Sequence, residues 1–162
     1  MKLMRHGPQG QEKPGLVDAQ GALRDLSAHV ADISSATLHP DTLARLAAID
    51  PATLPVLPAD TRLGACVGQV GNVVAIGLNY ADHAAEAGLK PPGQPIVFNK
   101  HNGAISGPFD DVLLPPGSEK LDWEVELGIV IGQHAWHVDE ADALKHVAGY
   151  CLVNDVSERA YQ

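Results

Sequence analysis

Residues 121–132 read Leu-Asp-Trp-Glu-Val-Glu-Leu-Gly-Ile-Val-Ile-Gly, and the rest of the chain is organised around this stretch. Side chains alternate between the two faces of a β-strand, so the pattern predicts one strand with an apolar face and an acidic face. The acidic face carries Asp122, Glu124 and Glu126. Carboxylates that share a face repel one another and are rarely buried without a partner. Two interpretations follow: they bind a hard divalent cation, which prefers oxygen ligands, or they face water at a sheet edge.

The composition indicates a folded globular protein. The chain has 162 residues, of which 45% are hydrophobic, and a net charge of −9 from 20 acidic and 11 basic residues. This length suits one domain or one and a half, with enough apolar residues for a core. No run of Lys and Arg would neutralise a phosphate backbone, and no apolar run approaches the ~18 residues of a membrane span. We therefore expect no nucleic acid and no membrane as partner. A small anionic substrate remains compatible, because a bound metal reverses the local charge.

The two cysteines and the N-terminus indicate the compartment. Cys66 and Cys151 lie in apolar, strand-like contexts without CxxC or Cys/His zinc spacing, so we interpret them as buried thiols in a reducing compartment. The first residues turn polar too soon for a signal peptide, which favours a cytoplasmic protein. The 16 glycines and 12 prolines favour short strands joined by tight turns over a helical bundle.

The order of sequence patterns predicts two parts. Residues 1–59 indicate a small N-terminal α/β subdomain with an antiparallel meander and a helix over 40–49, and the proline-rich stretch 51–58 reads as a linker. A subdomain boundary is therefore expected near residue 60. Beyond it, apolar runs predict strands at 61–67, 72–76, 96–99, 121–132 and 149–153, and a helix at 139–149.

One short predicted helix carries a candidate catalytic pair. Asn79 suits its N-cap and Gly88 the position after its end. Glu86 lies three positions after His83, so on a helix the two side chains share a face and come within hydrogen-bonding reach. A carboxylate that orients an imidazole makes it a general base, although such spacing is more often an ordinary surface pair. Asp155, after an apolar run, suits a third metal carboxylate or the start of a turn.

Five motifs follow one another along the second part of the chain: Gly77-Leu-Asn-Tyr-Ala-Asp-His-Ala-Ala-Glu86, Leu114-Pro-Pro-Gly-Ser118, Asp122-Trp-Glu-Val-Glu-Leu127, Ala148-Gly-Tyr150 and Asn154-Asp-Val-Ser-Glu-Arg159. Taken in order, these motifs resemble the fumarylacetoacetate hydrolase family over nearly all of residues 60–162. That resemblance implies an α+β, β-rich fold: a mixed β-roll, incomplete in this chain, preceded by a small α/β N-terminal subdomain. Residues 5–15 further resemble a bacterial branch that includes 2,4-diketo-3-deoxy-L-fuconate hydrolase and proteins called ureidoglycolate lyase.

The resemblance also implies a metal site. The family's Glu-x-Glu pair and later Asp fall on Glu124, Glu126 and Asp155. These residues would hold Mg²⁺ or Mn²⁺, with the remaining positions open to water and substrate. Asp122 lies outside this ligand set and is expected behind the ligands or in solvent.

Further residues match the family's catalytic and substrate positions. Its lid pair falls on His83 and Glu86, which the resemblance makes the catalytic base and its orienting carboxylate. Arg159 and Gln162 match positions that approach the substrate's carboxylate and oxo groups. The family also implies a small anionic keto-acid substrate and a homodimer.

The implied activity is metal-dependent hydrolysis of a carbon–carbon bond in a 2,4-dioxo acid, which gives pyruvate and a carboxylic acid. The alternatives are ureidoglycolate lyase, oxaloacetate decarboxylase or dienedioate isomerase on the same metal site, a non-catalytic metal-binding fragment, and carboxylates that are merely solvated. Family members continue well beyond the position of Gln162, with a catalytic lysine and strands that close the roll. We therefore expect the N-terminal part of a family member: a fragment, a chain whose remainder is not included here, or half of a split protein. Its strand edges and apolar faces should be uncovered.

Overall fold

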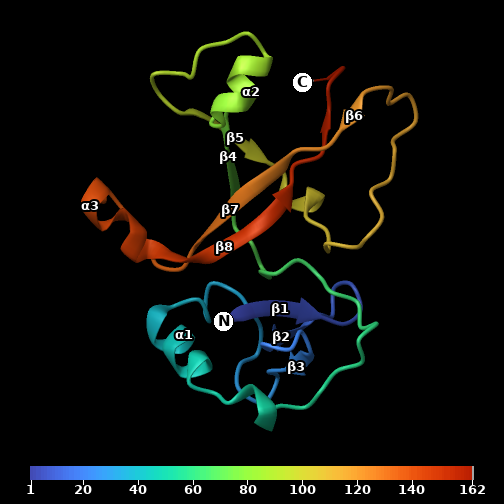
Figure 1. The fold of residues 1–162 in the computed structure, drawn as a ribbon, viewed down its shortest axis with the longest axis vertical. Helices are drawn as coiled ribbons and strands as arrows, with labels where there is room; N and C mark the ends of the chain where they lie inside the picture. The colour runs from blue at the N-terminus through green and yellow to red at the C-terminus, as the bar shows by residue number, and fades with distance from the viewer. Residues whose placement is uncertain (162) are drawn as a thin grey trace. The chain divides into compact units, whose positions relative to one another are not determined.

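The computed structural model describes residues 1–161, which form two compact units. Unit 1 comprises Met1–Gly68 and the segment from Gly107 onward, and unit 2 comprises Gln69–Ser106. Short strands dominate both units and helices are few (Figure 1), which confirms the α+β, β-rich fold class. The boundary expected near residue 60 stays a prediction.

The N-terminal part of unit 1 contains the predicted meander and the predicted helix. Strands β1 (Lys2–His6), β2 (Lys13–Val17) and β3 (Leu23–Asp25) pair antiparallel in that order. Helix α1 (Pro40–Ala47) has proline at its first position, where the missing N–H costs nothing. A short 3₁₀ turn, η1 (Pro51–Thr53), follows within the proline-rich stretch.

The core of unit 1 lies under this meander. It contains two almost fully enclosed side chains, Leu26 and Ile33, which expose 0% and 1% of their surface. Val130 and Ala148, from the C-terminal part of the chain, pack against the same cluster. The C-terminal strands of unit 1 therefore contact this core through these two partly buried side chains. The buried cluster consists of Leu16, Leu26, Val30, Ile33, Leu38, Leu46 and Leu54.

The stretch 121–132 forms two strands, so the prediction of one continuous strand is wrong. Strand β6 (Leu121–Asp122) pairs with β9 (Ser157–Glu158), whereas β7 (Val125–Ile131) pairs with β8 (Val147–Asn154), both antiparallel. The break falls at residues 123–124, where the chain changes partner. Between β7 and β8 lie α3 (Glu140–Ala143) and the 3₁₀ turn η3 (Leu144–His146), so the helix predicted over 139–149 ends early.

The β7–β8 ribbon, seen as a long pair of strands in Figure 1, has one exposed apolar face. Leu127 lies opposite Leu152, and Ile129 lies opposite Tyr150, so these four side chains share that face. Each is more than half exposed. Among residues 1–161 this face is uncovered, as expected from the sequence. On the other face, a Cβ at Gly128 would lie 2.7 Å from the Cys151 sulfur, so only glycine fits there.

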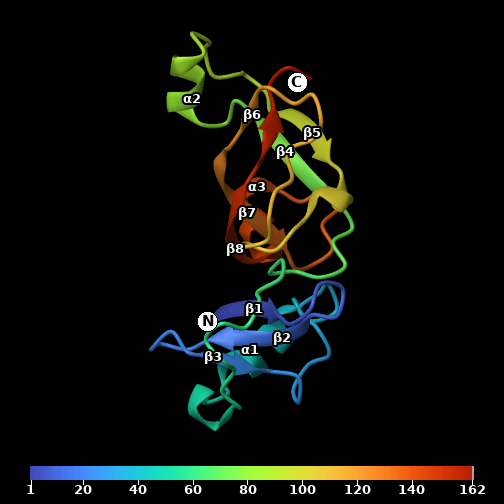
Figure 2. The ribbon, with the colours of Figure 1, turned by 90° about the vertical axis from the view of Figure 1, so that its right-hand side faces the viewer.

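Unit 2 contains a hairpin of β4 (Val73–Gly77) and β5 (Ile96–Lys100), with helix α2 (Ala81–Glu86) in the connection between the strands (Figure 2). A 3₁₀ turn, η2 (Asn102–Ala104), follows β5. The N-cap is Tyr80, one residue later than expected, because the chain turns through Leu78 at φ 50° before the helix begins. Residues 61–67, in unit 1, form only an isolated bridge between Leu63 and His6, so the strand predicted there is wrong.

We expect acid to destabilise unit 1 through its paired carboxylates. Hydrogen bonds from the Ala22 backbone and from Arg24 hold the pKa of Asp18 below its usual value, and Arg62 lowers the pKa of Asp110. Once the pH falls to about 4, the unfolded state therefore binds more protons than the folded state. The stabilisation that these two carboxylates contribute is complete at higher pH, and it is lost as the pH falls through their pKa values in the folded state. Urea unfolding followed by circular dichroism at pH 7 and pH 3 should show a lower free energy of unfolding at pH 3. In Asp110→Asn the difference in free energy of unfolding between pH 7 and pH 3 should be smaller. An equal free energy at both pH values would contradict this expectation.

The two cysteines give a second prediction. Both are free and half-buried rather than fully buried. A hydrogen bond from Cys151 lowers the pKa of Cys66 although burial opposes it, and the same bond raises the pKa of Cys151. Cys66 therefore forms the reactive thiolate more readily than Cys151, and iodoacetamide should modify it about tenfold faster. Peptide mass spectrometry measures both rates. Cys151→Ala should slow the reaction of Cys66, and equal rates at the two positions would contradict the assignment.

Candidate functional site

Three predicted carboxylates converge at one end of the β7–β8 ribbon. Glu124, Glu126 and Asp155 each offer an oxygen, and these atoms lie within 4.8 Å of one another. Glu124 precedes β7, Glu126 lies within it, and Asp155 directly follows β8. Because the strands are antiparallel and Val125 pairs with Asn154, the start of β7 meets the end of β8. Strand pairing thus brings together residues that lie about 30 positions apart in the sequence.

Backbone hydrogen bonds fix the end of the ribbon where these side chains meet. The Asp155 N–H donates to the Glu124 carbonyl at 2.8 Å, which continues the β7–β8 register by one residue. The Glu124 N–H donates to the Asn154 side-chain oxygen at 3.1 Å. Glu124, Glu126 and Asp155 therefore project from the same face of the ribbon. No role for Asn154 was predicted from the sequence, although an amide residue between an apolar strand and a candidate ligand is a usable signal.

Arg159 connects the cluster to Asp122. Its Nη2 atom lies 2.5 Å from Glu124 Oε1 and 3.0 Å from Asp122 Oδ2. The guanidinium, together with the backbone N–H of Trp123, holds the pKa of Asp122 below its usual value. Burial tends to lower the pKa of Arg159, but the hydrogen bonds of Arg159 to Asp122 and Glu124 outweigh the effect of burial and raise this pKa above its usual value. Asp122 is thus partly exposed, as expected, but it is also ion-paired with Arg159, a contact that was not predicted from the sequence. The substrate-binding role of Arg159 stays a prediction.

The cluster fits a hard divalent cation. All three donors are carboxylate oxygens, the ligand type that Mg²⁺ and Mn²⁺ prefer. Ligands on opposite sides of Mg²⁺ lie about 4.2 Å apart, so small side-chain rotations would bring this set to coordination distance. The three side chains are half-buried, which weakens solvent screening of their mutual repulsion. Metal binding by Glu124, Glu126 and Asp155 nevertheless stays a prediction, because solvated acidic groups are also common.

His83 and Glu86 belong to unit 2, on helix α2. Both side chains are exposed. The His83 backbone N–H donates to Asp82 Oδ1 at 2.9 Å, but within residues 1–161 no hydrogen bond joins the His83 and Glu86 side chains. Their catalytic role stays a prediction. Gln162, the second predicted substrate contact, lies outside the described residues.

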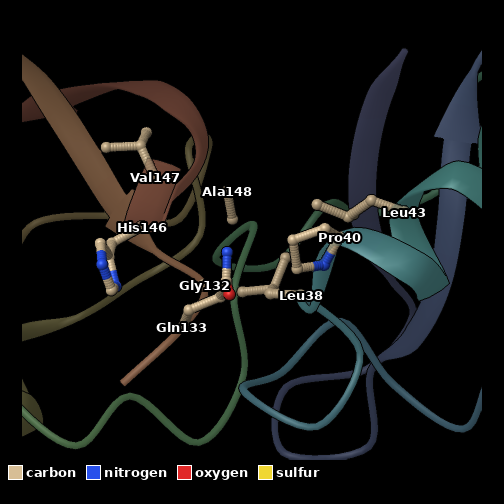
Figure 3. Close-up of a pocket in the computed structure, with 8 residues that line it drawn as sticks. All are labelled: Leu38, Pro40, Leu43, Gly132, Gln133, His146, Val147 and Ala148. Atoms are coloured by element: carbon tan, nitrogen blue, oxygen red, sulfur yellow. The ribbon is translucent and has the colours of Figure 1, made fainter. Parts of the chain in front are cut away.

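A small cavity of about 260 Å³ lies elsewhere in unit 1, between the start of α1 and the start of β8 (Figure 3). Most of its wall is apolar, and His146 and Gln133 are its polar side chains. None of the predicted site residues lines it. The residues that line the cavity are Leu38, Pro40, Leu43, Gly132, Gln133, His146, Val147 and Ala148.

In the part of the chain that the structure describes, no helix is long and apolar enough to cross a membrane.

Comparison with known proteins places the chain among curated relatives. It is 61% identical over all 162 residues to a provisionally named hydrolase of Burkholderia ambifaria and 62% identical to one of Burkholderia lata. The aligned region is 57% of each relative, so the chain spans little more than half the length of these curated proteins.

Solved structures show the same fold. A fumarylacetoacetate hydrolase from Exiguobacterium antarcticum is 31% identical, with a TM-score of 0.75, over all of this chain and 58% of its own. A 2-hydroxyhepta-2,4-diene-1,7-dioate isomerase from Mycobacterium marinum is 27% identical, with a TM-score of 0.69, over all of this chain and 56% of its own.

A family profile matches the region that carries both the carboxylate cluster and helix α2. It is described as "Fumarylacetoacetate (FAA) hydrolase C-terminal" and matches residues 72–162, more than half of the chain. The matched region begins just before β4 and includes every motif beyond residue 76 on which the resemblance rested. Sequence, fold and relatives agree, and the chain belongs to the fumarylacetoacetate hydrolase family.

Proposed function

We propose that the protein is a metal-dependent hydrolase that cleaves a carbon–carbon bond in a 2,4-dioxo acid. The substrate would be an acylpyruvate or a 2,4-diketo-3-deoxy sugar acid, and the products pyruvate and a carboxylic acid. The observation that carries the proposal is the convergence of Glu124, Glu126 and Asp155 within 4.8 Å in a chain of this family. The proposal concerns the activity of the whole protein, because this chain covers 57% of its curated relatives.

The metal would be Mg²⁺ or Mn²⁺, held by Glu124, Glu126 and Asp155. When bound, it would supply Lewis-acid stabilisation of the negative charge that develops on the substrate during bond cleavage. No serine or cysteine nucleophile is required, because water can attack directly once a base removes its proton.

The chain's own residues would move the proton and hold the substrate. His83 takes a proton from water as the water oxygen bonds to C4 of the substrate, and Glu86 orients the imidazole and stabilises its charged form. The C3–C4 bond then breaks, and its electron pair remains on the C3 side as the enolate of pyruvate. The His83 imidazolium returns its proton to C3, which gives pyruvate and restores the base. Arg159 would pair with the substrate carboxylate, for which a guanidinium fork is well suited.

A second candidate function is isomerisation of a dienedioate on the same site. Two solved relatives support it: the Mycobacterium marinum isomerase named above and a 5-carboxymethyl-2-hydroxymuconate delta-isomerase from Mycobacterium smegmatis, 29% identical to this chain. Such a reaction moves a proton between carbons and releases no pyruvate, so a product assay separates it from hydrolysis. A homodimer, which the family resemblance implies, and a cytoplasmic location, which the polar N-terminus favours, are further proposals.

The test is release of pyruvate from a 2,4-diketo-3-deoxy sugar acid in the presence of Mg²⁺, with and without a chelator. Lactate dehydrogenase and NADH report the pyruvate. Two proteins are compared: the 162-residue chain, and the same chain extended by the remaining part of a Burkholderia relative. Metal-dependent release from either protein supports the proposal, and Asp155→Asn should remove it. Turnover of a dienedioate, oxaloacetate or ureidoglycolate without release from the dioxo acid would favour the corresponding alternative. If the extended protein turned over none of these substrates, an enzymatic role would be contradicted.

A further inference from the structure

We infer that Arg159 is an internal counter-ion that competes with the divalent cation for Glu124, and that Asp122 is the anchor that retains the guanidinium when the cation binds. The inference rests on the proposed metal site and extends it to two residues outside the ligand set. It assigns both of them a role in setting the affinity of the site for metal.

The guanidinium contacts both carboxylates. Arg159 contacts a single oxygen of Asp122 from Nε at 3.1 Å and from Nη2 at 3.0 Å. It also contacts Glu124 Oε1, from Nη2 at 2.5 Å. One Nη2 atom thus joins a candidate metal ligand to a carboxylate that is not a ligand. Release of Glu124 would leave both contacts to Asp122 in place.

Strand pairing holds Arg159 beside Asp122 independently of Glu124. In the β6–β9 pair, Asp122 lies opposite Ser157, two residues before Arg159. The Arg159 backbone N–H donates to the Lys120 carbonyl at 2.9 Å, which extends the ladder by one bond. The Glu158 carboxylate also accepts from the Lys120 backbone N–H at 3.1 Å. The backbone therefore fixes the Asp122–Arg159 pair, whereas Glu124 lies in the break between β6 and β7.

Burial makes the competition effective. Glu124 exposes 19% of its side chain and Arg159 exposes 29%, so water screens their attraction less than it would at an open surface. A cation that uses Glu124 must overcome its charge-assisted bond to the guanidinium, and it is also repelled by that fixed positive charge. The competition does not require the same carboxylate oxygen, because the repulsion acts on the cation wherever it binds Glu124.

The experiment measures the dissociation constant of Mn²⁺ for the 162-residue chain by isothermal titration calorimetry at constant pH and ionic strength. Arg159→Gln should tighten binding about tenfold, because it removes the competing charge. Asp122→Asn should weaken binding about threefold to tenfold, because Arg159 then turns more fully to Glu124. In the double variant the effect of Asp122→Asn should largely disappear. This non-additivity distinguishes an anchor for Arg159 from a carboxylate that simply attracts the cation.

Matched controls come from a second ion pair of unit 1. Lys145 pairs with Asp142 at an exposed site on the α3–η3 segment. Lys145→Gln and Asp142→Asn change the net charge as the test variants do, and each should alter the Mn²⁺ dissociation constant by less than about twofold, because surface charges are screened. Arg159→Lys, which keeps the positive charge, should bind Mn²⁺ more weakly than Arg159→Gln. Circular dichroism confirms that each variant is folded.

Three results would overturn the inference. If Arg159→Gln binds Mn²⁺ more weakly than the unsubstituted chain or equally well, Arg159 does not compete with the metal, and the proposed metal site still stands. If Asp122→Asn weakens binding equally with and without Arg159, Asp122 is not an anchor for the guanidinium. A chain that binds no Mn²⁺ in unsubstituted form overturns the metal site itself, and the counter-ion role with it.

Discussion

Replacement of Glu126 by glutamine is expected to raise the Mn²⁺ dissociation constant at least about 100-fold, because loss of a direct ligand exceeds the 10- to 100-fold cost of losing a residue behind the ligands. Glutamine keeps the size and shape of the side chain but removes the charge that a hard cation requires. Glu126 lies within β7, opposite Val153, and its carboxylate belongs to the 4.8 Å cluster. Isothermal titration calorimetry measures the loss.

The control for this variant is a glutamate of the same unit that takes no part in the cluster. Glu140 begins α3 and is exposed. Glu140→Gln should leave Mn²⁺ binding within about twofold, since exposed charges interact weakly with distant ions. Unchanged Mn²⁺ binding by Glu126→Gln would mean that the ion binds without Glu126. The proposed ligand set of three carboxylates would then be wrong.

Alternation along β7 was predictable from the sequence because it depends on local geometry alone. Glu126 faces one way and Val125 and Leu127 face the other, as a period of two requires. Which face becomes buried depends on another layer of the protein. Leu127 belongs to the apolar face of the strand, and it is 57% exposed. Hydrophobic periodicity therefore predicts the direction of these side chains, whereas burial requires a partner that residues 1–161 do not supply.

The break after β6 could not be predicted from the sequence for a related reason. Nothing in the run from Leu121 to Ile131 resembles a turn, so the pattern favours one strand. The interruption arises because the Glu124 backbone pairs with Asn154 and Asp155, while β6 pairs with β9. The end of a strand is set by its partner, and partners 30 residues away leave no local signal. The same long-range pairing places Arg159 beside Asp122, which explains why that ion pair was missed.

Two carboxylates of the candidate site, Glu124 and Glu126, were predictable because acidic residues are unusual in an otherwise apolar strand, and either a cation or water explains them. From its sequence context Asp155 suited a turn equally well, and only the family resemblance added it to the ligand set. His83 and Glu86 gave a weaker signal, because a histidine and a glutamate three residues apart are common on exposed helices. Their exposed positions on α2 fit either interpretation. Only a functional measurement separates the two.

Replacement of His83 by glutamine is expected to lower the rate of pyruvate release by about 10²- to 10⁴-fold, the usual contribution of a positioned general base. Glutamine is polar and similar in size but cannot accept the proton of the attacking water. His83 is not among the carboxylate ligands, so Mn²⁺ affinity should stay within about twofold, as expected for a substitution that removes no ligand. Both quantities are measured on the protein that turns over in the pyruvate assay.

Two further variants give this prediction its sharpest form. Glu86→Gln keeps the imidazole but removes the carboxylate that orients it, so its rate should lie between those of the unsubstituted protein and His83→Gln. His134→Gln, at an exposed position in the connection after β7, should leave the rate unchanged. Normal turnover by His83→Gln would place the base elsewhere in the protein. If His83→Gln lost both Mn²⁺ binding and turnover, His83 would act on the metal site rather than on water. Because the proposed mechanism separates metal binding from proton transfer, it requires that the two properties respond to different residues: Mn²⁺ affinity to Glu126, and turnover at full metal occupancy to His83.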